Sequence, residues 1–234
     1  MNQALSISFV LPMYNESANI RGSVETLKTI ASTLTANYEI IVVDDASTDD
    51  SADIVEEIAA KDDTVKLLRL EKNSMFGGAF AKGFKSASKD VIMYMDSDMP
   101  VSEEDIQESF PLINDSDIVT GYSKIKKGDT LKRKIISGGY NLLVQTLFGL
   151  NLKDINSGYK IVRRSLIEDI EFVSRSPFVD VELFLHARKK SGRVKQFPLI
   201  FRTRPGGKSY IARIPVIWAT FSDMLKVKIL SLKG

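Results

Sequence analysis

Two carboxylates stand two residues apart at the point where an apolar run ends, at Asp96 and Asp98. The run before them, residues 91–95, has the sequence VIMYM and is typical of a buried strand. Side chains on extended backbone alternate with a period of two, so both carboxylates project to the same side. Such a pair is costly unless positive charge lies beside it, and a divalent cation bound to a diphosphate would supply that charge. Oxygen ligands of this kind suit Mg²⁺ or Mn²⁺.

Two further apolar runs also end in polar residues. Residues 39–43, EIIVV, lead into Asp44 and Asp45, and residues 7–11, ISFVL, lead into the segment PMYNE. Open parallel α/β sheets bind their ligands at the carboxyl ends of the strands. Three polar strand ends therefore predict one ligand site along one edge of a sheet.

The elements that must position these residues alternate regularly between strand and helix in the first half of the chain. Strand patterns occur near 5–11, 39–43, 65–70, 91–95 and 117–120. Helix patterns occur near 17–35, 50–60, 77–87 and 102–113. This alternation predicts a parallel sheet with crossover helices. The later patterns are a helix at 135–150, a hairpin-like segment at 154–164, a helix at 179–190 and a strand at 194–201.

Composition and charge narrow the class of protein. The 234 residues are 44% hydrophobic and include no cysteine, which excludes disulfides, zinc–thiolate sites and cysteine nucleophiles. Residues 1–120 hold 9 Lys and Arg against 22 Asp and Glu, whereas residues 121–234 hold 23 against 8. The first half thus has acids to hold a metal, and the second has cations for an anionic acceptor or membrane surface. Docking of the two halves on each other is the alternative explanation of this asymmetry.

Four segments occur in an order that resembles the family 2 glycosyltransferases of GT-A fold: FVLPMYNES, IVVDDASTDDS, GGAFAKGFKSA and YMDSDM. The later segments RKIISGGYNLL and DINSGYKIVRR resemble the branch that makes dolichol- or polyprenyl-phosphate sugars. The resemblance covers residues 5–210 and implies an α/β, Rossmann-like, mostly parallel sheet flanked by helices. It implies that residues 1–120 bind the nucleotide sugar and that 121–210 form a basic acceptor side, followed by a C-terminal amphipathic helix within 211–234.

The resemblance also implies roles on the donor side. The candidates for contacts with the nucleotide are Pro12, Tyr14, Glu16, Asp44 and Asp45. Helix capping is the alternative role for the two aspartates. Asp96 and Asp98 match the motif that binds a metal and the diphosphate, with Mg²⁺ or Mn²⁺ as the cofactor. Relatives often carry glutamine where this chain has Pro100, so the metal shell differs at that position.

The acceptor decides between two kinds of enzyme. A lipid monophosphate is already ionised near neutral pH and needs no general base. In the resemblance, Arg133 and Ser137 match positions that contact such a phosphate. Relatives usually carry an arginine shortly after the glycine of the fifth strand, whereas this chain has Ser123 there, with Lys124 next to it as a further acceptor contact. The resemblance also implies that Lys208 belongs to a loop over the donor phosphates. A sugar hydroxyl would instead require a carboxylate base, for which Glu182 or its neighbour Asp180 is the candidate.

These features together predict an inverting, metal-dependent glycosyltransferase that moves one sugar from a nucleotide-diphosphate sugar to a polyprenyl phosphate. Transfer to a saccharide hydroxyl in surface-polysaccharide assembly is the alternative, and a non-catalytic nucleotide-sugar-binding or membrane-scaffolding domain is a third. The N-terminus lacks the features of a signal peptide, so we expect a cytoplasmic protein. Residues 211–232 mix apolar and basic side chains, which suits a helix on a peripheral membrane surface or one packed on the domain. No nucleic acid partner is expected, and a homo-oligomer or a membrane protein partner stays open.

Overall fold

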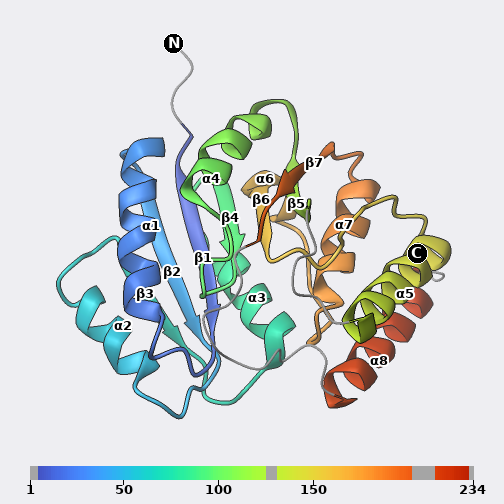
Figure 1. The fold of residues 1–234 in the computed structure, drawn as a ribbon, viewed down its shortest axis with the longest axis horizontal. Helices are drawn as coiled ribbons and strands as arrows, with labels where there is room; N and C mark the ends of the chain where they lie inside the picture. Colours follow the sequence, from blue (N-terminus) through green and yellow to red (C-terminus); the bar gives the residue numbers. More distant parts are fainter. Residues whose placement is uncertain (1–4, 125–130, 202–213, 232–234) are drawn as a thin grey trace.

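The computed structural model describes residues 5–124, 131–201 and 214–231, and its side chains are described except at 131–137, 214 and 231. Within these residues, seven strands form one sheet in the order β3-β2-β1-β4-β6-β5-β7 (Figure 1). The strands are β1 (Ile7–Met13), β2 (Tyr38–Asp44), β3 (Val65–Arg69), β4 (Val91–Met95), β5 (Ile118–Ser123), β6 (Tyr159–Arg163) and β7 (Val194–Leu199). The helices are α1 (Ile20–Leu34), α2 (Ser51–Ala59), α3 (Met75–Ser86), α4 (Glu103–Ser109), α5 (Leu131–Phe148), α6 (Arg164–Ile167), α7 (Val179–Lys189) and α8 (Ile214–Ser231), with a 3₁₀ helix at Phe110–Asp115.

The sheet is mostly parallel, as predicted. β1 pairs in parallel with β2 and β4, β2 pairs with β3, and β5 pairs with β7. β6 is antiparallel to both β4 and β5 and lies between them. The hairpin expected at 154–164 is therefore wrong, because a single strand at 159–163 takes two partners from earlier in the chain. The pairing of β6 with β4 and β5 depends on how the whole sheet assembles, so the sequence around residues 154–164 does not reveal it.

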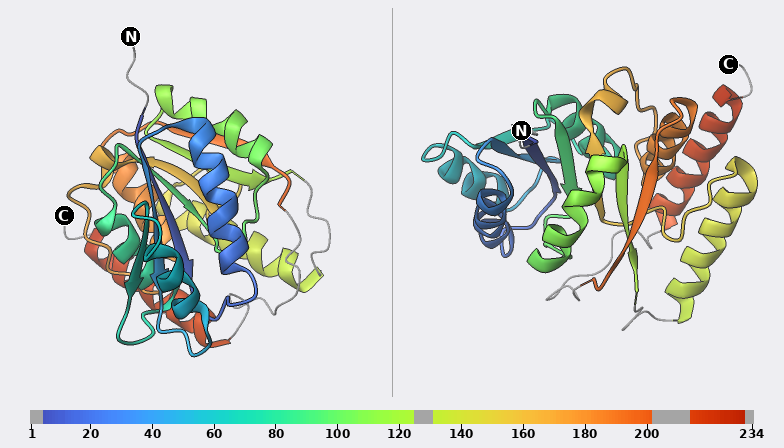
Figure 2. Two further views of the ribbon diagram at one scale, coloured as in Figure 1. Left: turned by 90° about the vertical axis from the view of Figure 1, so that its left-hand side faces the viewer. Right: turned by 90° about the horizontal axis from the view of Figure 1, so that it is seen from above.

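Helices cover both faces of the sheet (Figure 2). Phe9 and Leu11 of β1 lie in the core that includes α1, α2 and α4, whereas Val10 lies in the core that includes α3, α5, α7 and α8. Because successive strand residues face opposite cores, nearly every position must be apolar. This explains why the strands appear in the sequence as continuous apolar runs and end abruptly in polar residues.

Helices α5 and α8 lie side by side, although α7 separates them in the sequence (Figure 1). α5 begins four residues earlier than predicted, and α8 covers most of the segment expected at 211–232. The Lys228 ammonium on α8 donates to the Leu147 carbonyl on α5 at 2.8 Å. Val144 of α5 and Val227 of α8 belong to the same core cluster. α5 and α8 are thereby packed against each other on the face of the sheet that α3 and α7 also cover.

A buried carboxylate, Glu39, ties three strands together at the amino-terminal edge of the sheet. Its Oε1 accepts from the Ser8 hydroxyl at 2.6 Å and from the Ser88 amide at 2.8 Å. Its Oε2 accepts from the Lys66 ammonium at 2.7 Å. Burial by itself would raise the pKa of Glu39, but these hydrogen bonds outweigh it and lower the pKa to about 2.

We expect Glu39→Gln to lower the free energy of unfolding by about 2 kcal/mol at pH 7. The folded pKa lies below the unfolded value, so this stability is complete above about pH 4.5 and is lost as the pH falls toward 2. The difference between variant and wild type should accordingly shrink to about half or less at pH 3. Urea unfolding at both pH values measures it, with the exposed Glu71→Gln as the control. A pH-independent difference would contradict the assignment.

Candidate active site

The polar ends of β1, β2 and β4 meet at one edge of the sheet, as the sequence predicts. Met13 pairs with Asp44 across β1 and β2, and Val10 pairs with Tyr94 across β1 and β4. Asp96 follows Tyr94 by two residues, so it projects beyond the end of β4. Parallel neighbours thus bring the residues after three strands to the same edge.

The loops after β1 and β2 are joined by hydrogen bonds. The Thr48 amide donates to Asn15 Oδ1 at 2.8 Å, and the Asn15 amide donates to the Ser47 hydroxyl at 3.0 Å. The Glu16 amide donates to the Ser51 hydroxyl at 2.8 Å. Asn15 has a φ of 56°, a left-handed conformation that asparagine tolerates better than most residues. Asn15 was not among the predicted site residues, yet it fixes the loop that carries two of them, Tyr14 and Glu16.

The predicted nucleotide contacts of the first strand, Pro12, Tyr14 and Glu16, all lie in or directly after β1. Tyr14 is 41% exposed at this edge, which leaves its ring accessible to a planar ligand. Glu16 Oε2 accepts from the Asn19 side-chain amide at 2.9 Å. The structure therefore places the three residues together at the carboxyl end of β1.

Asp44 and Asp45 are both buried, and each holds a loop. Asp44 Oδ1 accepts from the Ser47 amide at 3.0 Å, so it caps the turn after β2. Asp45 Oδ1 accepts from the Ser74 amide at 2.6 Å and from the Ser74 hydroxyl at 2.7 Å, which anchors the start of α3. Burial raises the pKa of Asp45, although the hydrogen bonds from Ser74 oppose the increase. Asp44 thus caps a turn and not a helix, since the N-cap of α2 is Asp50, whereas Asp45 holds Ser74, the N-cap residue of α3.

Asp96 and Asp98 lie half-buried in the turn after β4. The Tyr94 hydroxyl donates to Asp96 Oδ1 at 3.1 Å. The other carboxylate oxygen, Oδ2, faces Gly158, the residue directly before β6, where a Cβ would lie only 2.5 Å away. Burial first, and then the charges of Asp96, Asp180 and Asp98, raise the pKa of Tyr94, so its hydroxyl stays protonated and can donate.

A buried ion pair lies behind this turn. The Lys160 ammonium of β6 is 3.0 Å from Asp180 Oδ1 of α7, and both side chains are at most 1% exposed. The ammonium also donates to the Ser157 carbonyl and lies 5.8 Å from the centre of the Tyr94 ring. Burial raises the pKa of Asp180 to about 6, although the nearby Lys160 charge lowers it. Asp180, a candidate base, therefore forms a buried ion pair with Lys160.

The other candidate base, Glu182, holds the loop before α7. Its Oε2 accepts from the Val173 amide at 2.9 Å, and its Oε1 accepts from the Ser174 amide at 2.7 Å. Burial raises the pKa of Glu182, and the hydrogen bonds from this loop oppose the increase. Both oxygens of this carboxylate thus already accept backbone hydrogen bonds.

The acceptor-side candidates are described only in part. Arg133 and Ser137 lie in the first two turns of α5, but their side chains fall outside the described part of the structure. Lys124 directly follows β5 and is exposed, and its amide donates to the Leu199 carbonyl at 2.8 Å. Lys208 lies outside the described residues. The ends of β5 and β7 therefore place Lys124 at the same edge of the sheet as the aspartates.

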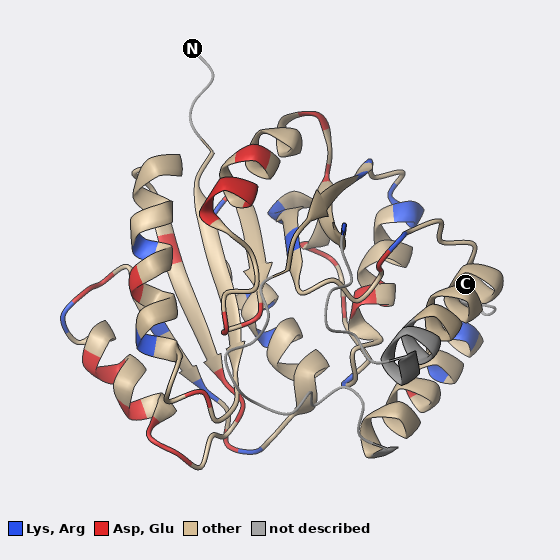
Figure 3. Ribbon diagram, viewed as in Figure 1, with Lys and Arg blue, Asp and Glu red and all other residues tan. Residues whose placement is uncertain are grey.

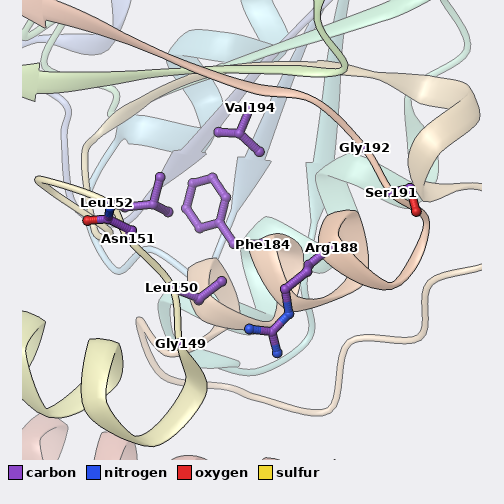
Figure 4. Close-up of a pocket in the computed structure, with 9 residues that line it drawn as sticks. All are labelled: Gly149, Leu150, Asn151, Leu152, Phe184, Arg188, Ser191, Gly192 and Val194. Atoms are coloured by element: carbon purple, nitrogen blue, oxygen red, sulfur yellow. The ribbon is translucent and has the colours of Figure 1, made fainter.

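A surface hollow of about 330 Å³ lies elsewhere, among α7, the start of β7 and the segment after α5 (Figure 4). Leu150, Phe184 and Val194 form its apolar wall, and Arg188 stands at its rim. The Arg188 guanidinium donates to the Phe148 carbonyl and so caps the end of α5. No predicted site residue lines this hollow, which lies at the amino end of β7 and away from the strand ends described above.

The residues present fit a divalent cation shared with a diphosphate. Asp96 and Asp98 supply hard oxygen ligands, and Gly158 leaves free the space in which one Asp96 oxygen lies. Mg²⁺ typically takes one or two carboxylates together with phosphate oxygens, so a larger protein cluster is not required. Among the described residues no group of three or more acidic, histidine or cysteine ligands occurs. Acidic residues are frequent in the first half of the chain, on α2, α4 and the loops (Figure 3).

Besides Asn15, three residues around Asp96 were not predicted from the sequence: Tyr94, Gly158 and Lys160. A tyrosine two residues before Asp96 and a lysine inside the strand YKIVR were visible signals, because a polar group on a buried strand needs a partner. The partners themselves come from β4, β6 and α7, and sequence spacing does not reveal that these elements are neighbours.

Residues 8–171 match the model of "Glycosyl transferase family 2". The glycosyltransferase AglD of Haloferax volcanii is 29% identical over 89% of this chain and 35% of its own length. The dolichol-phosphate mannosyltransferase of Pyrococcus furiosus is 31% identical over 88% of this chain and 59% of its own length. The chain thus spans about a third and about three fifths of these two relatives.

A solved structure shares the fold over almost the whole chain. Glucosyl-3-phosphoglycerate synthase of Mycobacterium tuberculosis, crystallised with Mn²⁺, UDP-glucose and phosphoglyceric acid, superposes with a TM-score of 0.73. The match covers 96% of this chain and 80% of that protein at 19% sequence identity. At this identity the likeness concerns the arrangement of the sheet and helices.

Proposed function

The chain belongs to glycosyl transferase family 2, and from this premise we propose that it transfers one sugar from a nucleotide-diphosphate sugar to a polyprenyl phosphate, with inversion at the anomeric carbon. Its fold, a mixed seven-stranded sheet flanked by helices, is the predicted GT-A fold. The acceptor class follows the name of the Pyrococcus relative, a dolichol-phosphate mannosyltransferase.

On the donor side, the proposal assigns the diphosphate to the edge formed by the ends of β1, β2 and β4. Asp96 and Asp98 would hold Mg²⁺ or Mn²⁺ together with the diphosphate. When bound, the ion would neutralise the negative charge that grows on the leaving diphosphate. Tyr14, Glu16 and Asp45 would bind and orient the nucleotide, and their loops are fixed in advance by the hydrogen bonds around Asn15 and Ser74.

The observation that supports the acceptor class is that both candidate bases already have partners inside the protein. Glu182 accepts two backbone amides, and Asp180 is paired with Lys160 in the interior. A phosphate acceptor needs no proton removed, because its oxygen is already ionised at neutral pH. Its requirement is for cations that hold and orient it, which suits Lys124 and the predicted contacts Arg133 and Ser137.

The saccharide alternative has one observation in its favour. Burial raises the pKa of Asp180 to about 6, and a general base works best when its pKa lies near the operating pH. Asp180 would have to leave its ion pair with Lys160 to act in this way, and a lysine left alone in the interior is costly. The lipid-phosphate acceptor is therefore our first choice.

The product distinguishes these acceptors. We would incubate the protein and Mn²⁺ with a panel of radiolabelled nucleotide sugars, offering a polyprenyl phosphate in one set and an oligosaccharide in the other. We expect label in an organic-extractable glycosyl phosphate, which mild acid releases as free sugar. Label incorporated into the oligosaccharide alone would overturn the lipid acceptor, and incorporation unaffected by chelator would overturn the metal requirement.

We further propose that α5 and α8 rest on the membrane that holds the acceptor. Nine large apolar side chains are exposed on these helices: Leu142, Leu143, Leu147, Ile217, Trp218, Phe221, Leu225, Ile229 and Leu230. We call this set the α5/α8 face. α5 contains no acid, and the single acid of α8, Asp223, is 4% exposed. Apolar residues without exposed acids suit an anionic lipid surface. No helix in the described ranges is long and apolar enough to cross a bilayer.

Changing Trp218 and Phe221 together to serine should lower binding to vesicles about tenfold or more, because two exposed aromatic side chains would no longer insert. Co-sedimentation with phosphatidylglycerol/phosphatidylcholine vesicles measures the bound fraction. The control is Val173→Ser, which removes a side chain 47% exposed outside the α5/α8 face. Equal binding by both variants, or a concentration-dependent dimer in place of vesicle binding, would contradict this part of the proposal.

A further inference from the structure

The Asp96 carboxylate is held from two sides. On one side, Oδ1 accepts the hydrogen bond from Tyr94 at 3.1 Å. On the other, Oδ2 occupies the space above Gly158, where a Cβ would lie 2.5 Å from Oδ2 and 3.0 Å from Cγ. The Asp96 amide also donates to the Gly158 carbonyl at 3.3 Å. Rotation of the carboxylate would either break the bond to Tyr94 or press against β6.

The Tyr94 ring is itself fixed. It is fully buried, and its centre lies 4.9 Å from that of Phe80 and 6.0 Å from that of Phe76. The Lys160 ammonium lies near the ring on the β6 side. A hydroxyl on so rigid a ring points in one direction and loses little freedom when it donates. Such a donor can set the orientation of a carboxylate before any ligand binds.

We infer that Tyr94 and Gly158 are positioning residues that preset the Asp96 carboxylate toward a divalent cation. Tyr94 supplies the donor that fixes one oxygen, and Gly158 leaves the room that the other oxygen requires. Neither residue contacts the cation, and both act through Asp96. The inference rests on the proposed function, because it takes Asp96 to be a ligand of the ion that holds the donor diphosphate.

Two substitutions remove these contributions separately. Tyr94→Phe keeps the ring and its packing and deletes the hydroxyl, whereas Gly158→Ala fills the space beside Asp96. Partners that orient a metal ligand are typically worth 10–100-fold in metal affinity, so we expect each variant to bind Mn²⁺ at least about tenfold more weakly. A titration with Mn²⁺ alone, in which electron paramagnetic resonance monitors the free ion, measures this affinity directly.

Matched controls separate positioning from general damage. Tyr159→Phe deletes the hydroxyl of another fully buried tyrosine. That hydroxyl is hydrogen-bonded to the Ser109 hydroxyl, with 2.7 Å between the two oxygens. Gly22→Ala adds a methyl group on α1 where nothing lies within 4 Å. Both controls should bind Mn²⁺ as the wild type does. Excess Mn²⁺ should also recover the turnover of Tyr94→Phe, which it would not do for a folding defect.

The outcomes are distinguishable. Weaker Mn²⁺ binding by Tyr94→Phe with unchanged binding by Tyr159→Phe supports the inference, even if Gly158→Ala fails to fold. Wild-type affinity in Tyr94→Phe, beside lost binding in Asp98→Ala, would overturn the positioning role and leave the proposed function intact. Wild-type affinity in Asp98→Ala as well would overturn the metal site itself.

Discussion

Asp98→Ala is expected to lower sugar transfer about a thousandfold or more while the protein stays folded. The change removes one of the two carboxylates that would hold the cation against the donor diphosphate. Asp98 lies half-buried in the turn after β4 and outside the apolar cores, so little packing is lost. Turnover at saturating donor, measured with Mn²⁺ and with Mg²⁺, tests the effect.

The control for Asp98→Ala is Glu104→Ala, which removes an exposed acid from α4 next along the chain. That variant should turn over like the wild type, since it changes charge in the same region but not at the strand end. Thermal melts of both variants confirm that they fold. Substantial activity in Asp98→Ala would contradict a metal-dependent mechanism through this pair.

Lys160→Met is expected to lower the free energy of unfolding by about 3–5 kcal/mol, the usual cost of removing one partner from a buried ion pair. Asp180 would remain in the interior without the cation that lies 3.0 Å away in the wild type. Replacing both partners, as Lys160→Met with Asp180→Leu, should restore most of that loss, because an apolar pair needs no compensating charge. Urea unfolding of the two single variants and the double variant at pH 7 forms the cycle.

Equal losses in the single and double variants would show that Lys160 and Asp180 do not stabilise each other. The surface pair Arg164 and Glu168, 3.0 Å apart on exposed side chains, provides the comparison. Removing either of its members should cost about 1 kcal/mol or less, because exposed ion pairs contribute little. The contrast tests burial as the origin of the effect.

This ion pair changes how a search for a general base must be designed. Asp180→Asn would leave Lys160 buried without its counter-charge, so a loss of activity would report damage to the fold as well as loss of a base. Glu182→Gln keeps one oxygen acceptor but places an amide nitrogen opposite a backbone N–H. The chemical identity of the product is therefore the cleaner test of the acceptor, with both variants read beside their thermal melts.

Local sequence pattern determined the arrangement of the first strands of this protein. Each apolar run near residues 7, 39 and 91 is long enough to form a buried strand, and each ends in polar residues at the carboxyl end. Successive parallel strands joined by helices must bring those ends to one edge. Asp45, Asp96 and Tyr14 could therefore be placed together before any coordinates were known. The spacing of Asp96 and Asp98 predicted two carboxylates on extended backbone, but β4 ends at Met95 and both residues lie in the turn after it, so the turn and not the strand period sets their directions.

Only the tertiary structure decided what surrounds those carboxylates. β6 enters antiparallel between β4 and β5, and this pairing brings Gly158 against Asp96 and Lys160 beneath Tyr94. No sequence period encodes such a neighbour, because strand order follows from how the whole sheet buries its two faces. The same packing turned Glu182 toward backbone amides and Asp180 toward Lys160, although the sequence offers both as candidate bases near a helix start. Residue types and periodicity thus specified which groups reach the sheet edge, whereas long-range packing specified which of them are held, paired or left open to a ligand.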